Sequence, residues 1–212
     1  MTSSTRRTGA AKTPAGPDGR TRRRQERRDR VLAAALELFV ERGYDNTTMD
    51  EIAERADVAR ATVFNYFARK SLILEAWALR RRERAMAAVA EDQLVGRGLR
   101  EILTRYLGEL ADLNISTRGE AVALVGVSVR LTDVLGRPEL GREIADYVRQ
   151  CGDRARVRAD VNADQVGLLL SAGYFVTLTK WISVEPEPFD LRDELLKMVD
   201  LMLHGCLTRE PD

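Results

Sequence analysis

The sequence predicts an all-α protein with a small three-helix head at its N-terminal end, a larger helical body behind it, and about nine to ten helices in total. Two observations support this prediction. Apolar residues recur at helical spacing along most of the chain, and no useful length of sequence alternates between apolar and polar residues as a strand would. Breaks near 116–119, 136–138, 159–162 and 184–188 then divide the second half into four to six helices.

The first helix is expected from about Arg22, where a polar stretch gives way to a helical pattern. Its buried face is formed by residues spaced i, i+4, i+7 and i+8, namely Val31, Ala35, Leu38 and Phe39. Gly43 follows at a position suited to the left-handed residue that ends many helices. The sequence therefore predicts that this helix ends just before Gly43.

Two short helices and one long helix are expected next. Thr48 and Glu51 have the spacing of a capping box, in which each side chain bonds the other residue's backbone amide. Asp57 suits the tight break that follows, because aspartate tolerates the left-handed region better than most residues. A third short helix is expected over 60–67, and a long fourth helix from about Lys70.

The charge of the chain is unevenly distributed. Residues 1–30 contain ten arginines and lysines against three acidic residues, a balance of +7, so the other 182 residues sum to −6. Residues 1–20 have no apolar period and are predicted to form a disordered basic tail. A basic end on a slightly acidic body favours a polyanionic partner, with a solvated tail that aids solubility as the alternative.

The composition disfavours several classes of protein. The longest apolar run, 166–179, falls short of the roughly 20 residues that cross a bilayer, and the basic N-terminus has no apolar core like that of a secretory signal. Cys151 and Cys206 have no metal-ligand or redox spacing, and His204 is the sole histidine. We therefore expect no catalytic site, no metal, no cofactor, no membrane partner and a cytoplasmic location.

The head has the layout of a helix-turn-helix, in which two short helices joined by a tight turn lie behind a longer first helix. In that layout the N-terminal residues of the second short helix enter the DNA major groove. We therefore expect residues 21–85 to form a DNA-binding domain, with the helix-turn-helix over 48–67 and double-stranded DNA as its partner.

The segment 34–77 also resembles the DNA-binding domain of the tetracycline-repressor (TetR) family. The matching residues lie in one register over about 45 positions: Phe39, Gly43, Thr48, Ile52, Ala53, Val58, Thr62, Tyr66, Phe67 and Lys70. The chain departs from the family pattern at the turn residue Asp57, at the helix cap Ala59 and at Phe64, where the family usually has Tyr. The resemblance implies a sequence-specific transcriptional repressor that a small effector releases from its operator.

Roles in DNA binding follow for the second short helix. We expect Arg60 to bind a guanine edge and Asn65 to pair with an adenine, while Ala61 and Thr62 allow close approach and Thr62 touches a base or phosphate. Phosphate contacts are expected from Thr48, Tyr66 and Lys70. The alternative makes Arg60 and Asn65 solvated residues and Tyr66 a packing residue. The basic tail is expected to lie along the backbone or minor groove, or to have no fixed role.

For residues 86–212 the resemblance implies a ligand-binding and dimerisation domain, with a homodimer built from the last two helices. The final helix carries an apolar stripe of Leu191, Leu195, Met198 and Met202, and the preceding one carries a small-residue strip of Ala163, Gly167 and Ser171. Alternatively, both stripes fill the core of one protomer. A two-fold dimer implies a roughly palindromic operator.

An effector pocket is also implied in this domain. The candidate lining residues, each with a core role as the alternative, are Trp77, Tyr106, Leu124, Ser128, Tyr147, Cys151, Tyr174, Thr177 and Trp181. Few interior positions look charged, which favours an apolar or aromatic effector. The arginines at 80–82 and 84 are expected on a solvated helix face, with an acidic effector or DNA as the alternative partner.

Three other functions remain open from the sequence. An activator, or a regulator that answers no effector, has the same fold. A helical adaptor would use the body to bind other proteins. An enzyme is disfavoured, because the chain has neither a Gly-x-Ser-x-Gly nucleophile motif nor a glycine-rich phosphate loop.

Overall fold

The computed structural model describes residues 19–131, 139–153 and 156–206, and within these ranges it confirms an all-α fold of nine helices. The head contains α1 (Gly19–Arg42), α2 (Met49–Arg55) and α3 (Arg60–Tyr66). The body contains α4 (Ser71–Glu91), α5 (Leu99–Ser116), α6 (Arg118–Leu131), α7 (Glu139–Gln150), α8 (Ala163–Ile182) and α9 (Leu191–Cys206). None of these helices is both long enough and apolar enough to pass through a membrane.

The first helix begins earlier than the sequence predicts. Helix α1 starts at Gly19, so residues 19 and 20 belong to it and not to the disordered tail expected over 1–20. The rest of that tail, and the break expected at 136–138, lie outside the described residues. Arginines occupy most positions at the start of this helix, so the spacing of apolar residues gives no sign of where it begins.

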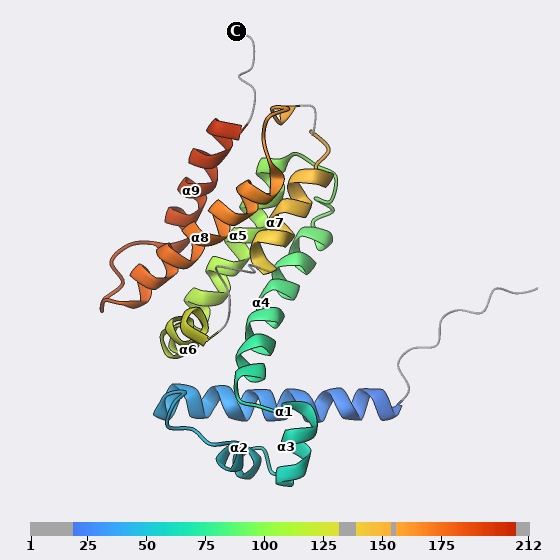
Figure 1. Cartoon of the computed structure of the whole chain (residues 1–212), viewed down its shortest axis with the longest axis vertical. Helices are drawn as coiled ribbons and strands as arrows, with labels where there is room; N and C mark the ends of the chain where they lie inside the picture. The colour runs from blue at the N-terminus through green and yellow to red at the C-terminus, as the bar shows by residue number, and fades with distance from the viewer. Residues whose placement is uncertain (1–18, 132–138, 154–155, 207–212) are drawn as a thin grey trace, which may run out of the picture.

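The head is a compact layer in which α1 lies across the end of the molecule, with α2 and α3 packed below it (Figure 1). Its core is formed by fully or almost fully buried residues of the three helices and the α3–α4 junction: Val31, Leu38, Phe39, Ile52, Val63 and Phe67. Gly43, with φ of +83°, ends α1 as predicted, and Asp57, with φ of +51°, makes the turn between α2 and α3. This core fixes α3 at the outer edge of the head.

Both N-terminal caps of the helix-turn-helix follow the sequence. The Thr48 hydroxyl accepts a hydrogen bond from the Glu51 amide at 3.2 Å, and the Glu51 carboxylate accepts one from the Thr48 amide at 2.8 Å. Helix α3 starts after Ala59 with no side-chain cap. The loss of such a cap typically costs about 1 kcal/mol, so α3 depends on its buried residues for stability.

In the body, the backbones of α7 and α8 come close together at two glycines, Gly141 and Gly167. A Cβ added to Gly167 would overlap the carbonyl oxygen of Gly141 and would lie 3.2 Å from the Cβ of Ala145. The small-residue strip of α8 therefore packs within the protomer. In α9, Leu191 and Leu195 of the predicted stripe are buried within the protomer, as are Val199 and Leu203, whereas Met198 and Met202 are half-buried against the same core. The core interpretation thus fits the α8 strip and the two leucines.

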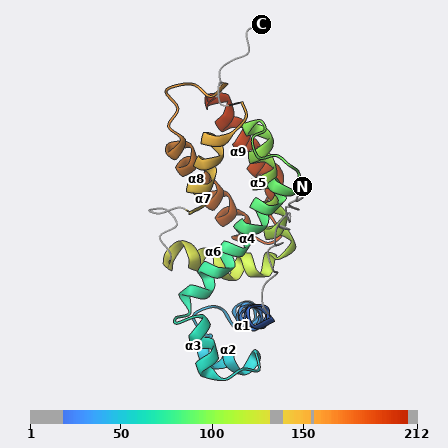
Figure 2. The ribbon, with the colours of Figure 1, turned by 90° about the vertical axis from the view of Figure 1, so that its right-hand side faces the viewer.

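The head and the body are connected through α1, α4 and α6. The predicted boundary between residues 85 and 86 falls inside α4, which runs from the head into the body (Figure 2). Helix α6 contacts α1 at Gly119, where an added Cβ would lie 3.4 Å from the Val40 side chain. An ion pair of 3.1 Å also joins Arg130 of α6 to Asp45 in the loop after α1.

The α7–α8 contact predicts opposite effects of two glycine substitutions. Gly167→Ala should lower the free energy of unfolding by roughly 1–3 kcal/mol, because the added methyl forces two backbones apart. The matched control is Gly126→Ala in α6, where a Cβ meets no atom within 4 Å. That change should stabilise the protein by about 0.5–1 kcal/mol, since alanine loses less entropy in a helix. Urea denaturation measures both, and equal stability of the two variants would contradict the close contact.

Candidate nucleic-acid interface

Helix α3 presents one buried and several exposed positions. Val63 is fully buried, whereas Arg60, Ala61, Phe64 and Asn65 are exposed. The Arg60 side chain, 69% exposed, forms an ion pair of 2.9 Å with Asp50 and lies over the Phe64 ring at 5.4 Å. An exposed ion pair of this kind is worth little, so Arg60 can exchange Asp50 for a ligand at small cost.

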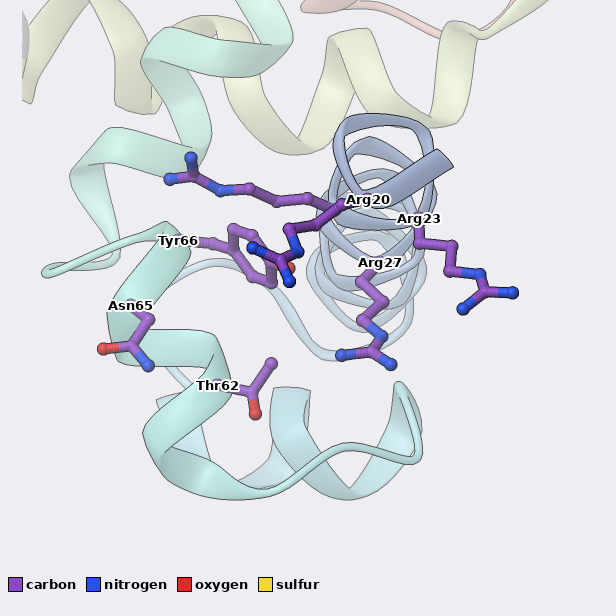
Figure 3. A pocket seen from close by; sticks show the side chains of 7 residues that line it. Arg20, Arg23, Arg27, Thr62, Asn65 and Tyr66 are labelled. Carbon is purple, nitrogen blue, oxygen red and sulfur yellow. The ribbon is translucent and has the colours of Figure 1, made fainter. Parts of the chain in front are cut away.

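The end of α1 lies beside α3 and carries four arginines on one face. Arg20, Arg23, Arg24 and Arg27, spaced i, i+3, i+4 and i+7, border a groove of about 530 Å³ together with Thr62, Asn65 and Tyr66 of α3. Figure 3 shows arginines projecting from α1 on one side and the three α3 side chains on the other. Within the described part of the chain, none of these four arginines has an ion-pair partner.

This arrangement was only partly expected. Thr62, Asn65 and Tyr66 were predicted as DNA contacts, and the structure brings them together in one groove. Sequence reasoning counted the arginines as part of a basic end and missed their place in this groove. Their helical spacing was the signal that pointed to a single face. Four unpaired guanidinium groups beside polar side chains of a short helix form a surface suited to phosphate groups.

Thr48 is exposed, but its hydroxyl already takes part in the capping box. It donates to Glu51 Oε2 at 2.8 Å as well as accepting from the Glu51 amide. The hydrogen bond from the Thr48 amide is the main cause that lowers the pKa of the Glu51 carboxyl, and the bond from the Thr48 hydroxyl comes next. The guanidinium of Arg42, at 2.9 Å, lowers this pKa further. The position of Thr48 at the start of α2 is confirmed, while its contact with phosphate stays a prediction.

Lys70 has a structural role that sequence reasoning missed. Its ammonium donates to the carbonyl oxygens of Tyr44 at 2.6 Å and Thr47 at 2.7 Å, and it lies 4.3 Å from the centre of the Tyr44 ring. Burial lowers the pKa of this ammonium. A third, longer hydrogen bond of 3.4 Å goes to the carbonyl oxygen of Asp45. The residue thus ties the start of α4 to the loop between α1 and α2, and a phosphate contact would replace one of these three hydrogen bonds.

The nine candidate pocket residues occupy buried and half-buried positions of the described chain. Trp77 lines a groove between α1 and α4, described below. Buried positions are occupied by Tyr106, Leu124, Ser128, Cys151, Tyr174 and Trp181, while Tyr147 and Thr177 are half-buried. Tyr106 packs edge-on against Tyr147 at 5.4 Å, and Tyr174 accepts a hydrogen bond of 2.8 Å from Asn114. These contacts fit the core role that the sequence left open for each residue.

The expectation of a solvated arginine face on α4 is wrong for two of its members. Arg81 is only 9% exposed; its guanidinium lies 4.4 Å from the Trp77 ring and 3.1 Å from the Glu120 carboxylate. Arg82, half-buried, binds Glu143 at 3.0 Å. Among the described residues, Arg81 is the one charged side chain in the buried class, so the premise that the interior holds few charges stands. The sequence could not place Arg81 and Arg82, because the carboxylates that accept them come from the later helices α6 and α7.

Comparison with known proteins identifies the family. Residues 31–77 match the family model described as bacterial regulatory proteins, tetR family. Over 157 residues, covering 69% of this chain and 80% of the relative, the chain is 30% identical to YvkB, an HTH-type transcriptional regulator of Bacillus subtilis. The chain belongs to the TetR family. The resemblance found in segment 34–77 is thereby confirmed.

Other transcriptional regulators match over different lengths. FasR, a transcriptional activator of Mycolicibacterium smegmatis, is 48% identical over 61 residues, which cover 28% of this chain and 28% of FasR. The chain spans about a quarter of the length of the curated relatives that it matches in this way. The crystal structure of Thermus thermophilus FadR, a repressor in complex with lauroyl-CoA, is 30% identical with a TM-score of 0.64, covering 87% of this chain and 97% of FadR.

The arginine groove predicts the salt dependence of DNA binding by this TetR-family chain. Arg24→Ala and Arg27→Ala should each reduce the slope of log K against log salt by about 0.9, the value for one phosphate contact on duplex DNA. Arg22→Ala is the control, because Arg22 pairs with Glu26 and does not line the groove. Fluorescence anisotropy at several salt concentrations gives the slopes; slopes equal to that of the unmodified protein would show that α1 does not touch DNA.

Proposed function

We propose that this protein is a sequence-specific DNA-binding transcriptional regulator that acts as a repressor and leaves its operator when a small molecule binds. One observation carries the DNA-binding part. Thr62, Asn65 and Tyr66 of α3 and the unpaired arginines of α1 border a single groove at the outer end of the head, and the exposed Arg60 lies on the same short helix. Such a surface combines groups that read base edges with groups that hold phosphates.

The roles within this surface follow from exposure and chemistry. Arg60 stands at the N-terminal end of α3, where the recognition helix of such a motif meets base edges, and its guanidinium suits the two acceptors of guanine. Asn65 suits adenine, and Ala61 leaves room for close approach. Thr62 and Tyr66 lie toward the arginines, which favours contacts with the backbone.

The test is binding to DNA from upstream of the protein's own gene. Arg60→Ala should weaken specific binding by roughly 1–3 kcal/mol and relax the preference at one base pair. Arg142→Ala, an exposed arginine of α7 paired with Glu139, is the matched control and should leave affinity unchanged. Fluorescence anisotropy with the operator and with single-base variants measures both effects. Equal weakening on every sequence would make Arg60 a phosphate contact, and binding no tighter than to random DNA would favour a protein-binding adaptor.

Repression is favoured over activation by the likeness to FadR, which covers nearly all of that repressor. Activation remains the alternative, because FasR is an activator and the chain is 48% identical to it over 61 residues. Transcription from the operator-bearing promoter, measured with and without the protein, separates the two. A repressor lowers transcript levels, whereas an activator raises them.

We also propose a homodimer built on the outer faces of α8 and α9. The α8 strip and the leucines Leu191 and Leu195 of α9 pack within the protomer, but other apolar residues of the two helices face outward. These are Leu168, Leu169 and Val176 of α8 and Leu201 of α9, which is 77% exposed. Exposed apolar side chains gathered on two adjacent helices favour burial against a second copy. Two heads related by a two-fold axis then favour a roughly palindromic operator.

Charge on this outer face should separate the protomers. Leu169→Glu and Leu201→Glu each place a carboxylate where the partner would bury it, which costs several kcal/mol unless the charge is paired. Val95→Glu, at a 64% exposed position in the α4–α5 loop, is the control. Sedimentation equilibrium should give monomers for the first two variants and dimers for the control. Circular dichroism checks that helix content is unchanged, and dimers in all three variants would place the interface elsewhere.

A further inference from the structure

A groove of about 750 Å³ lies between the head and the body, where α4 leaves α1. Leu32, Leu36 and Val40 of α1 form one wall, and Trp77 and Arg81 of α4 form the other. The volume falls in the range of sites that hold small molecules. The lining combines apolar side chains with charged and polar ones, which are Glu37, Glu41, Arg80, Arg81, Arg84, Thr117 and Glu120.

The polar group at the inner wall is the buried guanidinium of Arg81. Its terminal nitrogens donate to Asn114 at 3.4 Å, to Thr117, and to Glu120 at 3.1 Å. Its Nε is buried and has no partner among the described residues. An unpaired donor on a buried charge is costly, so this arrangement is incomplete as it stands.

The other charged residues around the groove decide which charge on a ligand the groove favours, and its carboxylates already have partners. Glu37 and Glu41 both bind Arg55, at 3.2 and 2.8 Å. Glu120 accepts from Arg81 and, at 2.7 Å, from Trp77.

The donors are less well satisfied than these carboxylates. Arg84 is already paired with Glu91 and Glu109. Arg80 lines the groove, is exposed, and has no ion-pair partner within the described ranges. Among the described residues of this site, the charged groups without a protein partner, Arg80 and the Nε of Arg81, are therefore donors, which favours a ligand with a negatively charged acceptor.

We propose that this groove binds a small amphipathic carboxylate, with its apolar part against Leu36 and Trp77 and its carboxylate between Arg80 and Arg81. Leu36 and Trp77 supply contact area, while the two arginines supply charge-assisted hydrogen bonds. An apolar or aromatic effector without charge would leave both arginines unmatched.

The position of the groove connects this ligand to DNA. Its α1 wall belongs to the same helix that carries the arginine face beside α3. A ligand bound between α1 and α4 therefore contacts the helix that is proposed to hold phosphate groups, and it can change the position of that helix. This consequence rests on the proposed function, whereas the binding of the carboxylate does not.

Binding is tested with phenylbutyrate, and with phenylbutylamine and phenylbutanol as probes of the same apolar part. In a Trp181→Phe background, Trp77 is the sole tryptophan and its fluorescence reports on the groove. Phenylbutyrate should give a saturable change at the lowest concentration, with the alcohol weaker and the amine weakest. Arg80→Gln should raise the Kd for phenylbutyrate about fivefold, which corresponds to the upper end of the range for an exposed ion pair.

Two further variants separate the site from general effects. Ala33→Phe, at an exposed position in the groove, should abolish the change, whereas Arg84→Gln, whose arginine is already paired, should leave it nearly unaltered. Thermal unfolding confirms that each variant is folded. Equal affinity for the three probes, no saturable change with phenylbutyrate, or unchanged binding in Arg80→Gln and Ala33→Phe would overturn the proposal.

The link to DNA is measured separately, as the release of labelled operator by phenylbutyrate. Release that is lost in Arg80→Gln would support the link. Saturable binding to Trp77 without release would support the carboxylate site and overturn its connection with the proposed function.

Discussion

The ammonium of Lys70 lies at the junction on which the head depends. It satisfies the carbonyls of Tyr44 and Thr47 in the loop between α1 and α2, where buried peptide groups need partners. The Thr47 hydroxyl donates to the Gly43 carbonyl at 2.9 Å and closes the same loop. The start of α4, the end of α1 and the entry into α2 thus share one set of hydrogen bonds. These hydrogen bonds also help to hold α3 in place. Helix α3 lies between α2 and α4 in the chain and has no side-chain cap of its own.

The head was predictable because its signals are local. A capping box needs residues three apart, and a left-handed glycine or aspartate acts on its own peptide unit, so Thr48, Gly43 and Asp57 could be placed from sequence alone. The body was less predictable because its choices are not local. Periodicity identified the small-residue strip around Gly167, but it cannot say whether such a strip meets another helix of the same chain or a second copy. Arg81 illustrates the same limit, since its partner Glu120 lies 39 residues away.

The candidate site was predictable in part for a related reason. Family resemblance singled out the residues of α3, because they form a contiguous motif. The arginines of α1 belong to the same groove, yet they precede the motif and were counted with a tail. Only the early start of α1 at Gly19 brings Arg20 and Arg27 onto one helical face. Charge counted over a segment says which kind of partner is attracted, whereas helix register says which side chains reach it.

The length of α1 gives the head a mechanical property. The helix has 24 residues and is continuous from its arginine end to the groove beside α4. At 1.5 Å per residue, Arg20 lies about 24 Å along the axis from Leu36. A rigid rod of that span acts as a lever: a tilt of about 5° near Leu36 carries the far end through about 2 Å. Hydrogen bonds to phosphate tolerate only about 0.5 Å in donor–acceptor distance. Small angular changes at the body would thereby become misfits of several tenths of an ångström or more at the phosphate contacts proposed for the arginine end of α1.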